Sequence, residues 1–163
     1  MEIIQVDGHT LREAAAIHAE SWQASHRAFC SAEFVARHTP SRQEAYLKGK
    51  LDACAKLFML VAGKPVGIVS VTGSLIEDLY VLPSSQNQGF GAVLLRHAVS
   101  ECAGVPTLWT LENNDSAARF YGRNGFAPTG RRNVVAGRLG EIEFALTDKP
   151  KAEQLFSGRT DNL

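Results

Sequence analysis

The sequence carries the run Gln86-Asn87-Gln88-Gly89-Phe90-Gly91 between an apolar segment, 75–83, and an amphipathic one, 92–102. A strand, a turn with glycines and a helix start, in that order, are typical of an anion site. Glycine lets the backbone approach a ligand closely, and the free N–H groups of the first helical turn point at that ligand. The positive end of the helix dipole adds to the attraction. The run therefore predicts a site for the phosphate or pyrophosphate of a cofactor.

Two common nucleotide sites do not fit this run. A Rossmann fingerprint lies at the first strand–helix turn of its unit, with an acidic residue about twenty residues further on. Here several predicted strands precede the run, and Gly104-Val105-Pro106 occupies the region where the acidic residue is expected. The run also lacks the lysine followed by serine or threonine that completes a P-loop. By itself, a turn with two glycines does not distinguish a cofactor site from an ordinary helix entry.

The composition is that of one ordinary globular domain. A chain of 163 residues is long enough to bury a core, and its seventeen basic and seventeen acidic side chains balance, which predicts no nucleic-acid partner. Cys30, Cys54 and Cys102 lack metal-ligand spacing, so we expect reduced thiols, no metal site and a cytoplasmic location. The first residues do not resemble a signal peptide, and the longest apolar run, 57–62, is too short to span a bilayer. No membrane partner is expected.

Hydrophobic periodicity and turn residues predict alternating strands and helices. The expected strands are 3–6, 57–62, 66–72, 75–82, 107–111, 129–135 and 139–146. The expected helices are 11–22, a short or broken one within 31–39 that ends before Pro40, 41–55, 92–102 and a last one that runs to about 123 and can be capped by Asn113, Asn114 or Asp115. These elements predict a mixed sheet with helices on both faces. The domain is expected to span 1–146, followed by a polar tail over 147–163.

Further motifs flank the glycine-bearing run. Leu79-Tyr80-Val81-Leu82-Pro83 precedes it, and Asn114-Asp115-Ser116-Ala117, Phe120-Tyr121 and Gly125-Phe126 follow much later. In this order the motifs closely resemble the GNAT superfamily of acetyl-CoA-dependent N-acetyltransferases. Ala19-Glu20-Ser21-Trp22 and Leu108-Trp109 are similar to a common bacterial subgroup. The resemblance covers most of the chain. It implies an α/β protein with a mixed sheet, the GNAT acyl-CoA N-acyltransferase fold, with about seven strands flanked by about four helices.

The resemblance implies acetyl-CoA as the co-substrate and assigns its contacts. The backbone N–H groups of Gln86, Asn87, Gln88, Gly89, Phe90 and Gly91, with Ala92 beside them, would hold the pyrophosphate. The backbone of Leu79, Tyr80 and Val81 would lie along the pantetheine arm. The N–H of Val81 would donate to the thioester carbonyl and stabilise the oxyanion. Asn114 would hold the pantetheine from the other side, and Ala117 of the same motif is counted among the cofactor contacts.

Three residues are candidates for proton transfer. The resemblance places Tyr121 near the sulfur, as the acid that protonates the departing thiolate and also contacts the cofactor; the alternative is a core aromatic residue. Glu77, four residues before the valine, could accept the amine proton directly or through water, whereas a salt bridge or an exposed strand end is the alternative. Asp78 follows directly. Because neighbours in a strand point to opposite faces, we expect only one of these two acids to meet the reacting centre.

The acceptor side is less sharply defined. Trp22 and His26 lie one helical turn apart and, with Glu77, could line the acceptor pocket; a core tryptophan is the alternative. The subgroup often has a tyrosine near the position of His26, followed by a Gly-Ile/Leu-Pro-like turn. Arg27-Ala28-Phe29-Cys30 stands there instead, a departure that bears on the acceptor pocket. Arg131, Arg132 and Arg138 could attract an acidic acceptor.

The predicted reaction is direct attack by the primary amine of a small molecule on the thioester while both ligands are bound. No covalent enzyme intermediate is expected, since no cysteine stands in a nucleophile motif. Two alternatives stay open. One is acetylation of a protein or peptide at its N-terminus or a lysine, and the other is a non-catalytic acyl-CoA-binding module. A homodimer is also considered, because many relatives form one.

Overall fold

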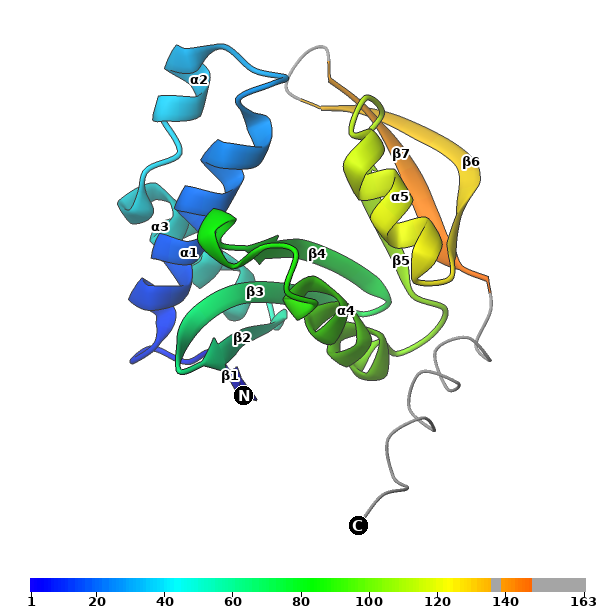
Figure 1. The fold of residues 1–163 in the computed structure, drawn as a ribbon. Coiled ribbons are helices and arrows are strands. Elements are labelled where there is room, and N and C mark those ends of the chain that lie inside the picture. Colours follow the sequence, from blue (N-terminus) through cyan, green and yellow to red (C-terminus); the bar gives the residue numbers. More distant parts are fainter. Residues whose placement is uncertain (136–138, 148–163) are drawn as a thin grey trace. The chain divides into compact units, whose positions relative to one another are not determined.

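The computed structural model describes residues 1–135 and 139–147. They fall into two compact units, Met1–Cys102 and the described part of Ala103–Leu163, and each unit is described by itself. Figure 1 traces both. The predicted tail lies outside the described residues except for Thr147, and so does Arg138. Within residues 1–135 and 139–147, no helix combines the length and the apolar character needed to cross a bilayer.

The first unit contains four antiparallel strands in the order β1-β2-β3-β4. Its elements are β1 Glu2–Gln5, α1 Leu11–His26, α2 Ala32–Ala36, α3 Pro40–Asp52, β2 Lys56–Ala62, β3 Lys64–Thr72, β4 Leu75–Val81, the 3₁₀ turn η1 Pro83–Ser85 and α4 Phe90–Glu101. The short helix α2 ends before Pro40, as predicted, and Pro40 begins α3 one residue earlier than predicted, with Thr39 as the N-cap that accepts a hydrogen bond from the Arg42 N–H at 3.3 Å. Proline suits this first helical position because its missing N–H would have no helical partner there.

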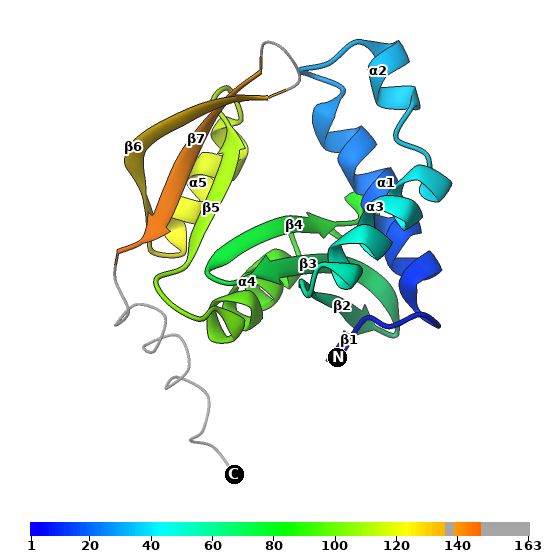
Figure 2. The same ribbon diagram turned by 180° about the vertical axis from the view of Figure 1, so that it is seen from behind.

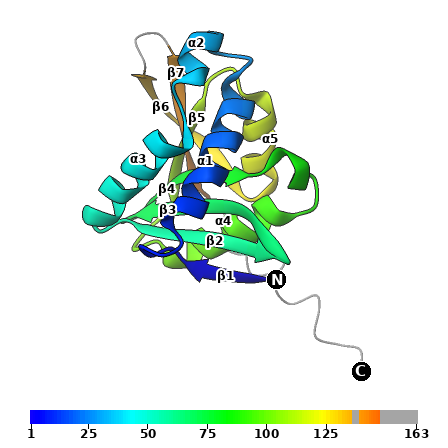
Figure 3. The same ribbon diagram turned by 90° about the vertical axis from the view of Figure 1, so that its left-hand side faces the viewer.

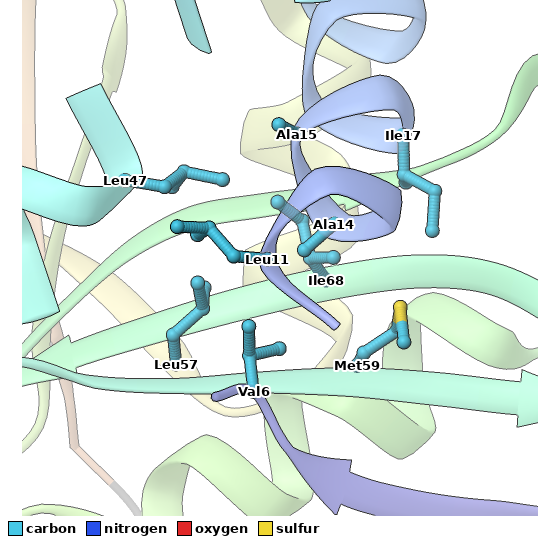
Figure 4. Close-up of a cluster of buried hydrophobic side chains, with 9 residues drawn as sticks. All are labelled: Val6, Leu11, Ala14, Ala15, Ile17, Leu47, Leu57, Met59 and Ile68. Atoms are coloured by element: carbon cyan, nitrogen blue, oxygen red, sulfur yellow. The ribbon is translucent and has the colours of Figure 1, made fainter. Parts of the chain in front are cut away.

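Helices cover both faces of this sheet, as predicted (Figure 3). Leu57 and Met59 of β2 pack with α1 and with Leu47 of α3 in the buried cluster of Figure 4. The intervening Phe58 points to the opposite face, where its ring lies 4.4 Å from that of His97 in α4. Gly67 of β3 lies under the same helix. The two faces therefore follow from the alternation of side chains along a strand.

The second unit is a three-stranded antiparallel sheet with one helix. It consists of β5 Thr107–Leu111, α5 Asp115–Arg123, β6 Phe126–Val135 and β7 Leu139–Leu146. Strand β7 pairs with both β5 and β6. Helix α5 packs against β6 (Figure 2). The described residues thus contain seven strands and five α-helices, which confirms the predicted α/β class; the short α2 lies where a short or broken helix was expected within 31–39.

Candidate active site

Strand β4 contains one residue more than the segment of β3 that it faces. Glu77 pairs with Ser70, but the next recorded pair is Tyr80 with Ile68, so the register shifts between them. Asp78 has a φ angle of +49°, which is uncommon for a residue other than glycine. An extra residue, a register shift and a distorted backbone together define a β-bulge.

The bulge sets the direction of the amides that follow it. The N–H of Leu82 donates to the carbonyl of Val66 in the extension of β3 at 2.8 Å. Because successive N–H groups in a strand alternate in direction, the N–H of Val81 points away from β3. The carbonyl of Val81 accepts a hydrogen bond from Gln86 Nε2 at 3.1 Å. The strand assigned to the pantetheine arm is thereby tied to the loop assigned to the pyrophosphate.

Both acids of β4 point to the same face of the sheet. Lys50 Nζ lies 2.9 Å from Glu77 Oε2 and 2.7 Å from Asp78 Oδ2, so one ammonium group contacts both carboxylates. The premise that these two neighbours point to opposite faces therefore fails here, and the expectation that only one of them meets the reacting centre stays a prediction. Strict alternation fails because the extra residue of a bulge interrupts it.

Asp78 is the centre of a buried polar network. Its side chain is 10% exposed. Oδ1 lies 3.1 Å from His18 Nε2 and accepts a hydrogen bond from the Tyr46 hydroxyl at 3.2 Å. Oδ2 accepts from the Ser70 hydroxyl at 2.7 Å and faces Lys50. Every oxygen of this carboxylate has partners, which is what a buried charge requires.

The contacts within this network keep Asp78 and Lys50 ionised. Burial alone would raise the pKa of Asp78, but the hydrogen bond from His18 and the charge of Lys50 outweigh burial and keep that pKa well below its usual range. Burial alone would lower the pKa of Lys50, yet the charge of Asp78 and the bonds to both carboxylates raise it above its usual range. Burial, followed by the charge of Asp78, raises the pKa of Tyr46 to about 12. At neutral pH the pair is ionic.

Sequence reasoning did not identify His18, Tyr46, Lys50 or Ser70. His18 carried a usable signal, because it falls at helical spacing from the buried Leu11 and Ala14 and is itself buried. A histidine on such a stripe needs a polar partner. Lys50 gave no comparable signal, since a lysine near a helix end is usually solvated.

Glu77 differs from Asp78 in its exposure. Its side chain is 31% exposed, and its Oε2 accepts a hydrogen bond from the Thr72 hydroxyl at 3.1 Å in addition to the contact with Lys50. No residue within 1–135 and 139–147 bonds its second oxygen, Oε1. The salt bridge considered for Glu77 is therefore present, and one carboxylate oxygen remains open beside it.

The glycine-bearing run forms a tight turn into α4. Asn87 and Gly89 have φ angles of +60° and +82°, and Gly89 is the N-cap of the helix. The Gly89 carbonyl accepts from the N–H groups of Ala92 and Val93. Helix α4 therefore begins at Phe90, two residues earlier than predicted. The N–H groups of Phe90 and Gly91 precede these first helical bonds, which is the donor arrangement that suits an anion.

Trp22 and His26 lie against each other, as their spacing predicts. Their ring centroids are 3.9 Å apart and nearly parallel, and His38 stacks on the other face of the indole at 3.4 Å. Trp22 is half-buried and does not belong to the buried core. Burial lowers the pKa of His26 below its usual value. The neutral imidazole then stacks on the indole without a charge to desolvate.

In the second unit, Asn114 is the N-cap of α5. Its side-chain oxygen accepts a hydrogen bond from the N–H of Ala117 at 3.1 Å. Because the side-chain oxygen acts as the cap, the side-chain amide nitrogen of Asn114 remains available as a donor. Asn114 can therefore cap the helix and donate to a ligand at the same time.

Tyr121 belongs to an aromatic group of the second unit. Its ring lies 5.2 Å from Phe120 and 6.1 Å from both Phe126 and Phe144. Burial raises the pKa of Tyr121 to about 12. The phenol is thus protonated at neutral pH, the state that a general acid needs. No described residue forms a hydrogen bond with its hydroxyl.

The described arginines of β6 are paired. Arg131 Nη1 lies 3.0 Å from Glu143 Oε1, and Arg132 pairs with Glu112. The two carboxylates partly neutralise the positive charge that was expected to attract an acidic acceptor.

Residues 55–128 match the family model described as an acetyltransferase (GNAT) domain. This match covers less than half of the 163 residues, so it shows similarity to the family over that segment. The matched segment includes the bulged β4, the loop into α4, Asn114 and Tyr121. Helices α1 and α3, which bring His18 and Lys50 to Asp78, lie outside it.

Known proteins resemble part or most of the chain. The peptidyl-lysine N-acetyltransferase YjaB of Salmonella typhimurium is 37% identical over 71 residues, which is 44% of this chain and 48% of that relative. The chain spans about half the length of the curated relatives it matches. The solution structure of apo YjaB from Escherichia coli has a TM-score of 0.73 and 27% identity, covering 90% of this chain and 97% of that one. PaiA N-acetyltransferase from Thermoplasma acidophilum, solved with coenzyme A, has the same fold at a TM-score of 0.64 and 17% identity, over 87% and 96% of the two chains.

Proposed function

We propose that this protein transfers the acetyl group of acetyl-CoA to a primary amine, by direct attack while both ligands are bound. The observation that carries the proposal is the bulged β4 followed by the left-handed turn into α4, within a segment that matches the GNAT model. The bulged β4 directs a backbone N–H away from β3, where it can donate to the thioester carbonyl. The turn into α4 presents the free N–H groups of a helix N-terminus, which suit a pyrophosphate.

The first unit supplies most of the proposed cofactor contacts. The turn from Gln86 to Gly91, with Ala92, binds the pyrophosphate through backbone N–H groups. The backbone of Leu79, Tyr80 and Val81 holds the pantetheine arm, and the Val81 N–H stabilises the negative charge that develops on the thioester oxygen. Asn114 and Ala117 of the second unit contribute the remaining contacts, with the Asn114 amide as donor.

Two residues move protons in this proposal. Tyr121 protonates the departing thiolate, a role that its raised pKa supports because the phenol stays protonated at neutral pH. Glu77 accepts the amine proton, directly or through water. Of the two acids, Glu77 is the better base because its side chain is 31% exposed and its Oε1 is open, whereas Asp78 is buried and fully bonded.

The proposed acceptor is a small primary amine, bound near Trp22, His26 and Glu77. A lysine side chain in a peptide is the second candidate, since curated relatives that match this chain are peptidyl-lysine N-acetyltransferases. Both acceptors present the same uncharged amine to the thioester and differ in what surrounds it. The proposal concerns the single chain and includes no homodimer.

We expect saturating acetyl-CoA to raise the melting temperature by about 5–10 °C, because a ligand at a hundred times its Kd adds about 2.7 kcal/mol to the free energy of unfolding. Differential scanning fluorimetry measures the shift. Gly89→Val should abolish it, since Gly89 sits in the turn at positive φ. The matched control is Gly73→Val, another glycine at positive φ, in the β3–β4 turn, which should lower the melting temperature and keep the shift. An unchanged melting temperature of the wild type with acetyl-CoA would contradict cofactor binding.

A panel of small amines and lysine-containing peptides separates the acceptor classes. Release of the coenzyme A thiol reports turnover, and mass spectrometry of the product shows the acetylated nitrogen. Turnover with small amines supports the first candidate, and turnover confined to peptides supports the second. Acetyl-CoA binding with no thiol release on any acceptor would favour a non-catalytic acyl-CoA-binding module and reject the enzymatic proposal.

A further inference from the structure

We propose that Asp78 is a positioning residue, whose contacts with His18, Lys50 and Ser70 hold the β4 bulge and so aim the Val81 N–H at the thioester. The claim that the Val81 N–H points at the thioester rests on the proposed function. The claim that Asp78 stabilises the β4 bulge does not. Asp78 itself touches neither ligand in this proposal. It acts through the backbone that follows it.

The bulge decides which amide is available. If the pairing of β3 and β4 before the bulge continued unchanged, Leu79 would pair with Ile68 and Val81 with Val66. The Val81 N–H would then bond to β3, where Leu82 now donates to Val66 at 2.8 Å. A slip of one residue exchanges the inward and outward amides of a strand. The extra residue at position 78 therefore frees the Val81 N–H from the ladder.

Such a bulge has to be held in place. A residue other than glycine at φ +49° is strained, and it persists only when its surroundings fix it. Asp78 is fixed from three elements, with His18 from α1, Lys50 from α3 and Ser70 from β3. These contacts fall on both carboxylate oxygens, so the side chain cannot rotate without losing a partner.

A plain ion pair does not explain this arrangement. Lys50 already has a carboxylate partner in Glu77 at 2.9 Å, so the charge of Lys50 does not by itself require Asp78. Burying a second carboxylate is costly. The bonds to Asp78 offset that cost, and Asp78 is the residue of β4 with the distorted backbone. The four bonded side chains are His18, Tyr46, Lys50 and Ser70. The placement of the network at the bulge is what indicates a positioning role.

The test is Asp78→Asn, which keeps the shape of the side chain and removes its charge. With a misdirected Val81 N–H, we expect kcat to fall about 10- to 100-fold. The Kd for free coenzyme A, measured by calorimetry, should change less than about threefold, because the turn at Gly89 binds the pyrophosphate independently of the bulge. Asp52→Asn is the matched control, an exposed aspartate that pairs with Lys48, and should leave both constants unchanged.

Amide hydrogen exchange tests the hold on the bulge without any activity. The Leu82 N–H reports the register after the bulge, and the Val6 N–H, bonded to Leu57 across the same sheet at 2.8 Å, reports the stability of the unit. In Asp78→Asn we expect exchange at Leu82 to accelerate about tenfold more than at Val6. Tyr46→Phe, which removes one exposed donor to Asp78, should change the same ratio by about two- to tenfold and serves if Asp78→Asn does not fold.

Each outcome decides the matter. Equal acceleration at Leu82 and Val6 would show that Asp78 only stabilises the unit, and would overturn the proposal. Selective loosening at Leu82 with an unchanged kcat would overturn the link to the thioester. Selective loosening in a protein whose wild type transfers no acetyl group would uphold the hold on the bulge and reject the proposed function instead.

Discussion

Tyr121→Phe is expected to lower kcat about a hundredfold or more, because it removes the proposed proton donor for the departing thiolate. The substitution keeps the ring and its contacts with Phe120 and Phe126, so the Kd for acetyl-CoA should change less than about twofold. Turnover is measured as thiol release at saturating acetyl-CoA. Binding is measured by calorimetry without an acceptor.

A control separates the hydroxyl of Tyr121 from the packing around it. Phe120→Leu disturbs the ring contact at 5.2 Å and leaves the phenol in place. It should lower the melting temperature while kcat stays within about threefold of the wild type. Losses of kcat and of cofactor affinity in equal measure in Tyr121→Phe would argue against the acid role and for a packing role.

Lys50→Met is expected to lower the free energy of unfolding by about 3–5 kcal/mol, because it leaves a buried carboxylate without its counter-charge. The side chain of Lys50 is 14% exposed and contacts both acids of β4. Methionine has nearly the same length as lysine, so the loss in the free energy of unfolding measures the effect of removing the positive charge. Urea denaturation at pH 7 measures it.

Lys48→Met is the matched control on the same helix. Lys48 pairs with Asp52 at 2.7 Å, but its side chain is 63% exposed, so its removal should cost less than about 1 kcal/mol. Similar losses in the two variants would contradict a special role for the buried network.

The difference between wild type and Lys50→Met should also depend on pH. The folded pKa of Asp78 lies below its usual range, so its contribution is complete above that range and is lost as the pH falls through the folded pKa. The folded pKa of Lys50 is raised, so its contribution is lost only as the pH rises past the usual lysine range. The difference should be largest in the neutral range and narrow in strong acid. Constant destabilisation down to strong acid would show that the ion pair is not its source.

Local sequence rules predicted the elements of this protein well. Alternation and turn residues placed the hairpin of β2 and β3 and the strand β4 that follows, because each strand carries its own pattern of burial. The boundaries were less accurate. Helix α4 begins at Phe90 and not at Ala92, since Gly89 takes a left-handed conformation that lets it cap the helix directly. Residue type allowed Asn113, Asn114 or Asp115 as the cap of α5, because a short acceptor reaches the N–H groups of the next turn, and the structure selects Asn114.

The sequence by itself determined the fold class, the turn at Gly89 and the motif that carries Tyr121, because each of these depends on residues that are neighbours along the chain. Only the tertiary structure decided the surroundings of Glu77 and Asp78. Their spacing predicted opposite faces, and the bulge brought both to Lys50. The contacts that hold Asp78 come from His18 and Ser70, which lie 60 and 8 residues away along the chain. Such a network depends on how helices and strands pack, and no local pattern encodes which side chains will meet.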